Sequence, residues 1–287
     1  MTDKQKAYIA LFSFSAFAAS SYIMSRLVLV EHHNHVIGWY AVIVAFIFFV
    51  VIKRRFFISL KTVYMPHILF FGMSTTVIPY LILEGSRTVT PSLASSIVVS
   101  NALFIALFSR LLGRKKFSYI QMGALIIGFL GVVFVLYDQG SLSGKLYGVL
   151  SLLAAAILIA ICTVLFEPVV KNLGAAESTR RAFFIAAIIA LFLLILVGDY
   201  GQLSSPSLII AGGCFGVFGL AMPVLLFNIG MEFVGATDAA TFKMMIPLFA
   251  LAYGVIIFFE LPGLVATFAA AIILIALFIY HRYPLQE

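Results

Sequence analysis

The stretch Phe71-Gly72-Met73-Ser74-Thr75-Thr76-Val77-Ile78-Pro79 recurs 144 residues later as Phe215-Gly216-Val217-Phe218-Gly219-Leu220-Ala221-Met222-Pro223. That offset is close to half of the 287-residue chain. Each copy lies near the middle of an apolar span, and two more spans follow it. Because each half then has five spans, an odd number, the second copy starts on the opposite side of a membrane. Inverted repeats of this kind form a central site that opens to alternate sides.

The composition makes lipid the solvent of this fold. Hydrophobic residues make up 63% of the chain and charged residues 10%. A membrane helix needs about 20 apolar residues, and the alternation typical of a membrane β-barrel is absent. We predict an all-α integral membrane protein with two inverted five-helix repeats, residues 1–143 and 144–287. The ten predicted spans are 7–30, 36–52, 64–84, 91–112, 119–137, 145–166, 181–198, 207–230, 237–259 and 263–280.

Positive charge gives the predicted orientation, because Lys and Arg collect in cytoplasmic links. With the N-terminus inside, the inner segments hold 14 of the 18 basic residues and the outer links only Arg87 and Lys145. Arg26 and Lys243 lie within spans. We expect an inner (plasma) membrane protein with both termini cytoplasmic. The inner links would be 53–61, 113–117 and 167–181, and the outer links would include 31–35 and 138–144.

Several function classes are excluded. Orientation accounts for the net charge of +7, and no nucleic-acid motif is present. Cys162 and Cys214 are isolated in apolar spans. The sequence has no catalytic motif and no P-loop, so we expect neither an enzyme nor a resident cofactor or metal, and ATP is not the energy source. Glu31-His32-His33-Asn34-His35 could bind a metal or sense pH, but a solvated loop is the simplest interpretation. The N-terminal apolar run is interpreted as a retained first helix.

Two stretches resemble the drug/metabolite transporter superfamily, in its ten-helix EamA-type branch. The first comprises Pro79-Tyr80, Thr90 to Ser96, Gly113 to Lys116, and Gly123-Ala124 with Gly128 and Gly131-Val132. The second comprises Pro223, Gly235 to Ala240, and Phe259-Glu260. The resemblance implies solute transport by alternating access, with a cavity lined by spans one to four and six to nine. Spans five and ten carry small residues typical of helix packing.

Lys243 is the sharpest candidate for a binding residue. An ionisable side chain at membrane depth costs a few kcal/mol, so it is a functional candidate by default. On a helix its neighbours include Ala239 and Ala240, a small-residue face that favours packing inward. The residue would contact an anionic group of a substrate or a buried acid; a purely structural ion pair and snorkelling to the inner headgroups are the alternatives.

Other candidates are less distinctive. Arg26, on a face with Tyr22, could face the cavity or anchor the outer interface. Asn101 could bind substrate or join helices. Glu84 could carry a coupling proton or form a surface bridge with Arg87. The further predicted substrate-binding residues are Tyr80, Trp39 and Asn228, although Trp39 is also a plausible interfacial aromatic.

Pro79 and Pro223 predict paired gates. Each removes a helix hydrogen bond in mid-span, and Gly72 and Gly216 stand two turns earlier. We expect spans three and eight to bend there beside the central cavity. The alternative is two static kinks that only improve packing.

We predict that the protein is a secondary active transporter of a small organic solute. One buried lysine, with Arg26 as a second candidate cation, favours an amino acid or related anionic or zwitterionic metabolite, with export slightly favoured by family analogy. Alternatives are an importer of a vitamin- or nucleoside-type metabolite, a channel, and a non-transporting membrane subunit. The expected partners are the solute and membrane lipid, with protons as the candidate coupling ion, and the chain is expected to be a monomer or weak homodimer.

Overall fold

The computed structural model describes residues 2–28, 34–53, 62–89, 91–113, 118–138, 146–197, 206–259 and 264–283. Within these ranges the chain is helical and has no strand, as predicted. The first half contains α1 (Asp3–Val28), α2 (Asn34–Lys53), α3 (Met65–Ser86), α4 (Pro91–Val99), α5 (Asn101–Leu111) and α6 (Tyr119–Asp138). The second contains α7 (Leu146–Leu173), α8 (Ala175–Val197), α10 (Pro206–Cys214), the π-helix η2 (Phe215–Ala221), α11 (Met222–Val234), α12 (Ala236–Thr241), the 3₁₀ turn η3 (Phe242–Met245), α13 (Ile246–Phe258) and α14 (Leu264–Arg282).

Each predicted span corresponds to a helical rod. The rods of spans four, eight and nine are assembled from α4–α5, α10–η2–α11 and α12–η3–α13. Five stretches among the described residues are long and apolar enough to cross a membrane unaided: Met65–Ser86, Leu146–Leu173, Ala175–Leu196, Gly212–Val234 and Ala236–Ile257. The all-α membrane fold is therefore confirmed. The predicted links 31–35, 53–61, 113–117 and 138–144 lie largely outside the described residues.

The predicted inner link 167–181 is helical over nearly its whole length, and its cytoplasmic position stays a prediction. Helix α7 continues through Pro168 to Leu173, and α8 begins after Gly174, whose φ of +79° suits a helix end. The Glu167 side chain is only 14% exposed and accepts a hydrogen bond from Lys171 at 2.7 Å. Pro168 removes one helical hydrogen bond. Tertiary packing and the ion pair between Glu167 and Lys171, which are four positions apart, offset that loss.

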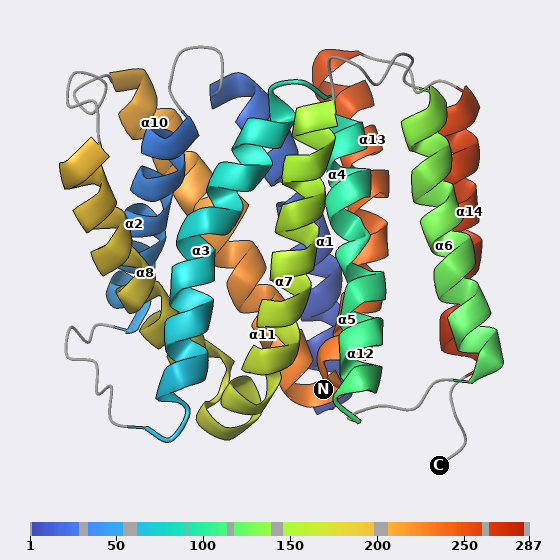
Figure 1. The fold of residues 1–287 in the computed structure, drawn as a ribbon, viewed down its shortest axis with the longest axis horizontal. Helices are drawn as coiled ribbons and strands as arrows, with labels where there is room; N and C mark the ends of the chain where they lie inside the picture. The colour runs from blue at the N-terminus through green and yellow to red at the C-terminus, as the bar shows by residue number, and fades with distance from the viewer. Residues whose placement is uncertain are drawn as a thin grey trace.

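Equivalent helices of the two halves make equivalent contacts with the opposite half. Helix α1 packs on α11 as α7 packs on α3, and α2 packs on η2 as α8 packs on α3. In Figure 1, α1 rises from the edge that carries the N-terminus, whereas α7 runs toward that edge. Gly72 approaches the carbonyl of Ala182 on α8, and Gly216 approaches that of Ala41 on α2. The boundary between residues 143 and 144 stays a prediction.

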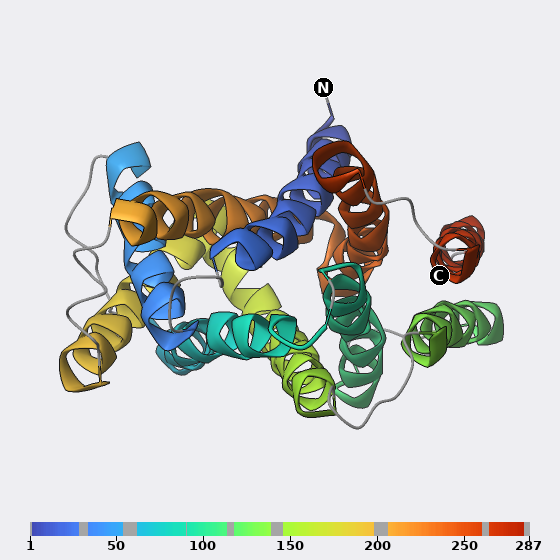
Figure 2. The same ribbon diagram turned by 90° about the horizontal axis from the view of Figure 1, so that it is seen from above.

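Helices α6 and α14 form a pair at one end of the bundle (Figure 2). Gly128 of α6 faces Ala276 of α14, and a Cβ added at Gly128 would lie 3.4 Å from the Ala276 Cβ. This is ordinary close packing between small residues. The pair leaves the remaining helices to enclose the centre of the molecule.

Candidate functional site

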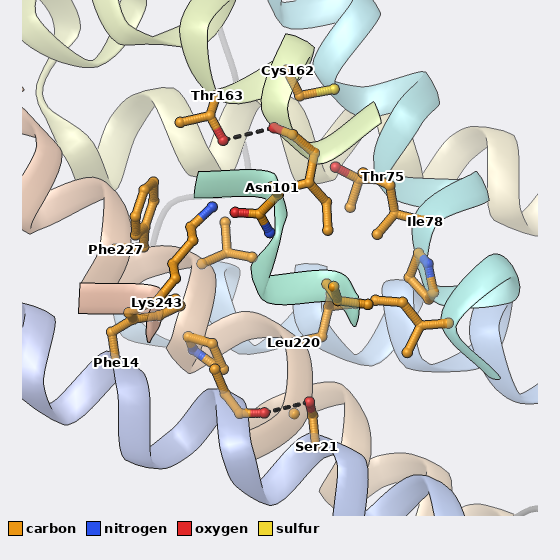
Figure 3. A pocket seen from close by; sticks show the side chains of 18 of the residues that line it. Phe14, Ser21, Thr75, Ile78, Asn101, Cys162, Thr163, Leu220, Phe227 and Lys243 are labelled. Atoms are coloured by element: carbon orange, nitrogen blue, oxygen red, sulfur yellow. Dashed lines mark hydrogen bonds between the residues drawn. The ribbon is translucent and has the colours of Figure 1, made fainter. Parts of the chain in front are cut away.

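A cavity of about 170 Å³ lies near the middle of the bundle. Helices from both halves line it: α1, α3, α4, α5, α7, η2, α11, η3 and α13. Most of its wall is apolar, with a few polar groups that converge on it (Figure 3). Six of the residues predicted to bind substrate or to gate transport line this cavity: Tyr22, Pro79, Asn101, Pro223, Asn228 and Lys243.

Three prolines loosen the backbone around the cavity. A proline has no N–H, and its ring crowds the carbonyl four residues earlier. Pro79, Pro223 and Pro247 stand inside spans three, eight and nine. The residues four positions before them are Thr75, Gly219 and Lys243, and all three line the cavity. Such gaps in a helix are tolerated in lipid where protein or a cavity takes up the freed group.

The two matched prolines have different surroundings. Helix α3 remains an α-helix through Pro79. Before Pro223 the chain forms the seven-residue π-helix η2, and the N–H of Met222 bonds the carbonyl of Val217 five residues earlier. Single π turns are common at functional sites. The second half therefore carries at η2 a distortion that the first half lacks.

Lys243 occupies η3, where the 3₁₀ turn joins α12 to α13. The residue is only 5% exposed, and its Nζ lies 4.2 Å from the ring centroid of Phe227. A desolvated cation–π contact of this kind contributes about 2 kcal/mol. Among the described residues, no carboxylate oxygen lies within 4.0 Å of this ammonium. The lysine therefore points into the cavity instead of snorkelling, and no ion pair with a described residue holds it.

Asn101 faces the same space from the first half. The fourth span breaks at Ser100, whose hydroxyl donates to the carbonyl of Ile97 at 2.6 Å, and α5 begins with Asn101. Asn101 is 3% exposed, and its Oδ1 has no hydrogen-bond partner among the described residues. Figure 3 shows this oxygen and the Lys243 ammonium turned toward each other. Span four and span nine, the fourth spans of the two halves, are both interrupted. The interruptions place the Asn101 acceptor and the Lys243 cation in the same cavity.

Asn228 is held by a neighbouring helix. Its Nδ2 donates to Oγ1 of Thr179 on α8 at 2.8 Å, in a buried position. That hydroxyl donates in turn to the carbonyl of Ala175 at 2.6 Å. Asn228 therefore joins α11 to α8 while it lines the cavity, and its role in substrate binding stays a prediction.

Five other predicted site residues are not part of the cavity wall. Tyr80, Trp39, Glu84, Gly72 and Gly216 are not among the described residues that line it. Trp39 packs against a buried cluster that includes Leu83 and Phe215. The side chain of Arg26 and the segment from Glu31 to His33 lie outside the described part of the chain. The roles assigned to these residues stay predictions.

Sequence reasoning missed several lining residues, namely Phe14, Ser21, Thr75, Cys162, Thr163 and Phe227. For Thr75 a signal existed, because it precedes Pro79 by four residues. For Cys162, Thr163 and Phe14 there was none, since an apolar span does not reveal which of its faces meets a cavity. Among the described residues, no group of three or more His, Cys, Asp or Glu could hold a metal.

Comparison with known proteins gives a consistent result. The model of the EamA-like transporter family matches twice, at residues 5–137 and 146–281. The uncharacterized transporter YdfC of Bacillus subtilis is 24% identical over 223 residues, which cover 77% of this chain and 72% of that protein. Human solute carrier family 35 member F3 is 28% identical over 116 residues, which cover 40% of this chain and 27% of that protein.

The fold has been seen in a crystal structure. That structure superposes with a TM-score of 0.72, at 15% identity, over 94% of this chain and 95% of the other. The double family match covers nearly the whole sequence, once in each half. The chain is a multi-pass membrane transporter, not an enzyme, and it belongs to the EamA-like transporter family.

Proposed function

We propose that this chain is a secondary active transporter that moves a small organic solute with an anionic group by alternating access. An amino acid or related anionic or zwitterionic metabolite is the first choice, and export is slightly favoured by analogy with the family. The observation that carries the proposal is the ammonium of Lys243, which is buried in a central cavity between the two halves. Transporters with inverted repeats bind solute and coupling ion at this depth.

The energetics favour an anionic partner for Lys243. A lysine at the centre of a membrane helix costs about 2.5–3.5 kcal/mol on insertion scales. The Phe227 ring offsets part of that cost, and no described carboxylate offsets the rest. A carboxylate that enters the cavity would pair with the ammonium in a low-dielectric environment, where a charge-assisted hydrogen bond is strong.

The cavity volume limits the size of the solute. An engineered apolar cavity of about 150 Å³ in another protein binds benzene. The cavity here is of similar volume, about 170 Å³. A compact metabolite of roughly that size fits the cavity in this structure, and larger solutes would require the cavity to widen.

The test is binding and flux with purified protein. Wild-type protein is screened for thermal stabilisation by amino acids, organic acids and amines, since a true ligand raises the melting temperature as its concentration rises. Hits are then measured for uptake into proteoliposomes. Lys243→Met, which keeps the length and apolar stem, should abolish stabilisation and flux by carboxylates. Lys243→Arg reports whether charge alone suffices.

The matched control is Lys171→Met. That lysine lies near the end of α7, its side chain is 47% exposed, and it pairs with Glu167. Its loss should leave binding and flux unchanged. Normal carboxylate transport by Lys243→Met would reject the proposal. So would a folded wild-type protein that binds amines or neutral solutes but no anion.

A further inference from the structure

The amide oxygen of Asn101 is a buried acceptor without a donor. The residue is 3% exposed, lines the central cavity and has no described hydrogen-bond partner at Oδ1. Leaving a buried acceptor unsatisfied is costly, so native proteins seldom keep one without a functional reason. Because Figure 3 shows the oxygen directed into the cavity, a bound molecule could supply the missing donor.

Several of the other polar side chains around the cavity already donate a hydrogen bond. The hydroxyls of Ser21, Thr75 and Thr163 donate to carbonyls one turn earlier, at 2.6, 2.7 and 2.7 Å. The Nδ2 of Asn228 donates to Thr179. Lys243 has no carboxylate partner among the described residues, and the Oδ1 of Asn101 is a fully buried lining atom without a described hydrogen-bond partner. Their side chains are turned toward the same part of a small cavity (Figure 3).

We propose that Asn101 determines specificity by accepting a hydrogen bond from an N–H or O–H group next to the anionic group of the solute. The favoured class is then small carboxylates that carry an amino or hydroxy substituent, and carboxylates without such a donor are disfavoured. This inference rests on the proposed function, because it takes the carboxylate at Lys243 as given. A site formed to hydrogen-bond a substrate discriminates strongly against the analogue that lacks the group.

Three-carbon acids provide the first probe set. L-alanine, L-lactate and propionate differ only in the substituent on the second carbon, which is ammonium, hydroxyl or hydrogen. L-leucine, 2-hydroxy-4-methylpentanoate and 4-methylpentanoate repeat the comparison at larger size. Binding to purified wild-type protein is measured by calorimetry. We expect the amino or hydroxy acid to bind roughly tenfold or more tightly than the plain acid in at least one set. Comparison of the amino acid with the hydroxy acid shows whether the site prefers an N–H or an O–H donor.

Asn101→Leu removes the acceptor and keeps a similar volume. This variant should bind the plain acid as well as wild type does, and its preference for the donor-bearing acid should fall to near one. Thr76→Val is the matched control, because Thr76 is buried but not among the described lining residues, and its hydroxyl donates to the carbonyl of Met73, so its loss should leave the preference intact. If Asn101→Leu is not monodisperse, the wild-type ratio alone decides, and a ratio near one overturns the proposal.

One rival gives a different result. If Asn101 only positions the Lys243 ammonium, Asn101→Leu weakens all carboxylates by the same factor and the ratio does not change. That outcome overturns the inference while carboxylate binding, and with it the proposed function, stands. If wild type binds no carboxylate in either set, and Lys243→Met changes nothing, both fail together.

Discussion

Gly216 lets two helices from opposite halves meet at backbone distance. A Cβ added there would lie 2.7 Å from the carbonyl oxygen of Ala41 and 2.9 Å from the Cβ of Val44, both on α2. Real Cβ atoms do not approach that closely, and here the obstacle is backbone, which does not rotate away. The residue was predicted as part of a gate. Its packing makes a stability role the first one to test.

We expect Gly216→Ala to destabilise the protein. Overpacking of a tight contact costs typically 1–3 kcal/mol, a fall of several degrees in melting temperature for a chain of about this size. Gly213→Ala, three residues earlier on α10, is the control, because nothing lies within 4 Å of its added Cβ. Thermal unfolding in one detergent compares them. Equal melting temperatures for the two variants would show that α2 yields easily at this contact.

At residue scale the sequence predicted Lys243 better than it predicted Asn101. A lysine in an apolar span is conspicuous because its insertion into the membrane costs free energy. Its small neighbours Ala239 and Ala240 are buried, as expected. Its position in a 3₁₀ turn was missed, although Pro247 four residues later is the physical cause. The break at Ser100 has no glycine or proline to announce it. It depends on tertiary packing and on the hydroxyl bond to Ile97.

The third spans of the two halves differ in form although both carry the phenylalanine–glycine pair and the proline at matched positions. Both prolines line the cavity, but π-helix η2 precedes Pro223 while α3 is regular at Pro79. Proline and phenylalanine–glycine positions predicted where a bend is possible. They do not predict which half carries the distortion, because the shared positions are the same in both halves while the packed neighbours differ. We interpret the difference as the asymmetry that a transporter with paired gates must have in any one state.

Replacing the prolines tests the gates. Pro79→Ala and Pro223→Ala each restore a backbone donor and stiffen the helix. We expect solute binding to stay within a few-fold of wild type while flux drops. Native Cys162 lines the cavity and reports on its access, with Cys214→Ser as background because Cys214 is exposed. Labelling of Cys162 by a membrane-impermeant thiol reagent should shift toward opposite sides in the two variants.

Static kinks predict another pattern. If both prolines only improve packing, the variants differ from wild type in melting temperature and not in the side from which Cys162 is labelled. Normal flux in both variants, or a shift in the same direction in both, would overturn the gate assignment. Glu84 would remain a separate candidate for proton coupling, since it does not line the cavity.

On the scale of the whole molecule, hydropathy and symmetry predicted the architecture. Ten apolar spans became ten rods because each must satisfy its backbone internally in lipid. The exchanged contacts of α1 with α11 and of α7 with α3 follow the repeat that the matched motifs indicate. The cavity was not predictable in detail. Its wall combines residues far apart in sequence, and apolar spans carry little pattern that separates lipid-facing from cavity-facing positions.

The orientation of the two halves gives the last prediction. Val63 and Pro206 are exposed and lie just before the third span of each half, and Figure 1 places the starts of α3 and α10 at opposite edges. Val63→Cys should be labelled from the cytoplasm and Pro206→Cys from outside, in a background without Cys162 and Cys214. A membrane-impermeant thiol reagent applied to intact cells and to inverted vesicles measures both. Labelling of both from one side would refute the inverted repeat. Labelling from opposite sides in the reverse sense would keep the repeat and overturn the assignment of the basic links to the cytoplasm.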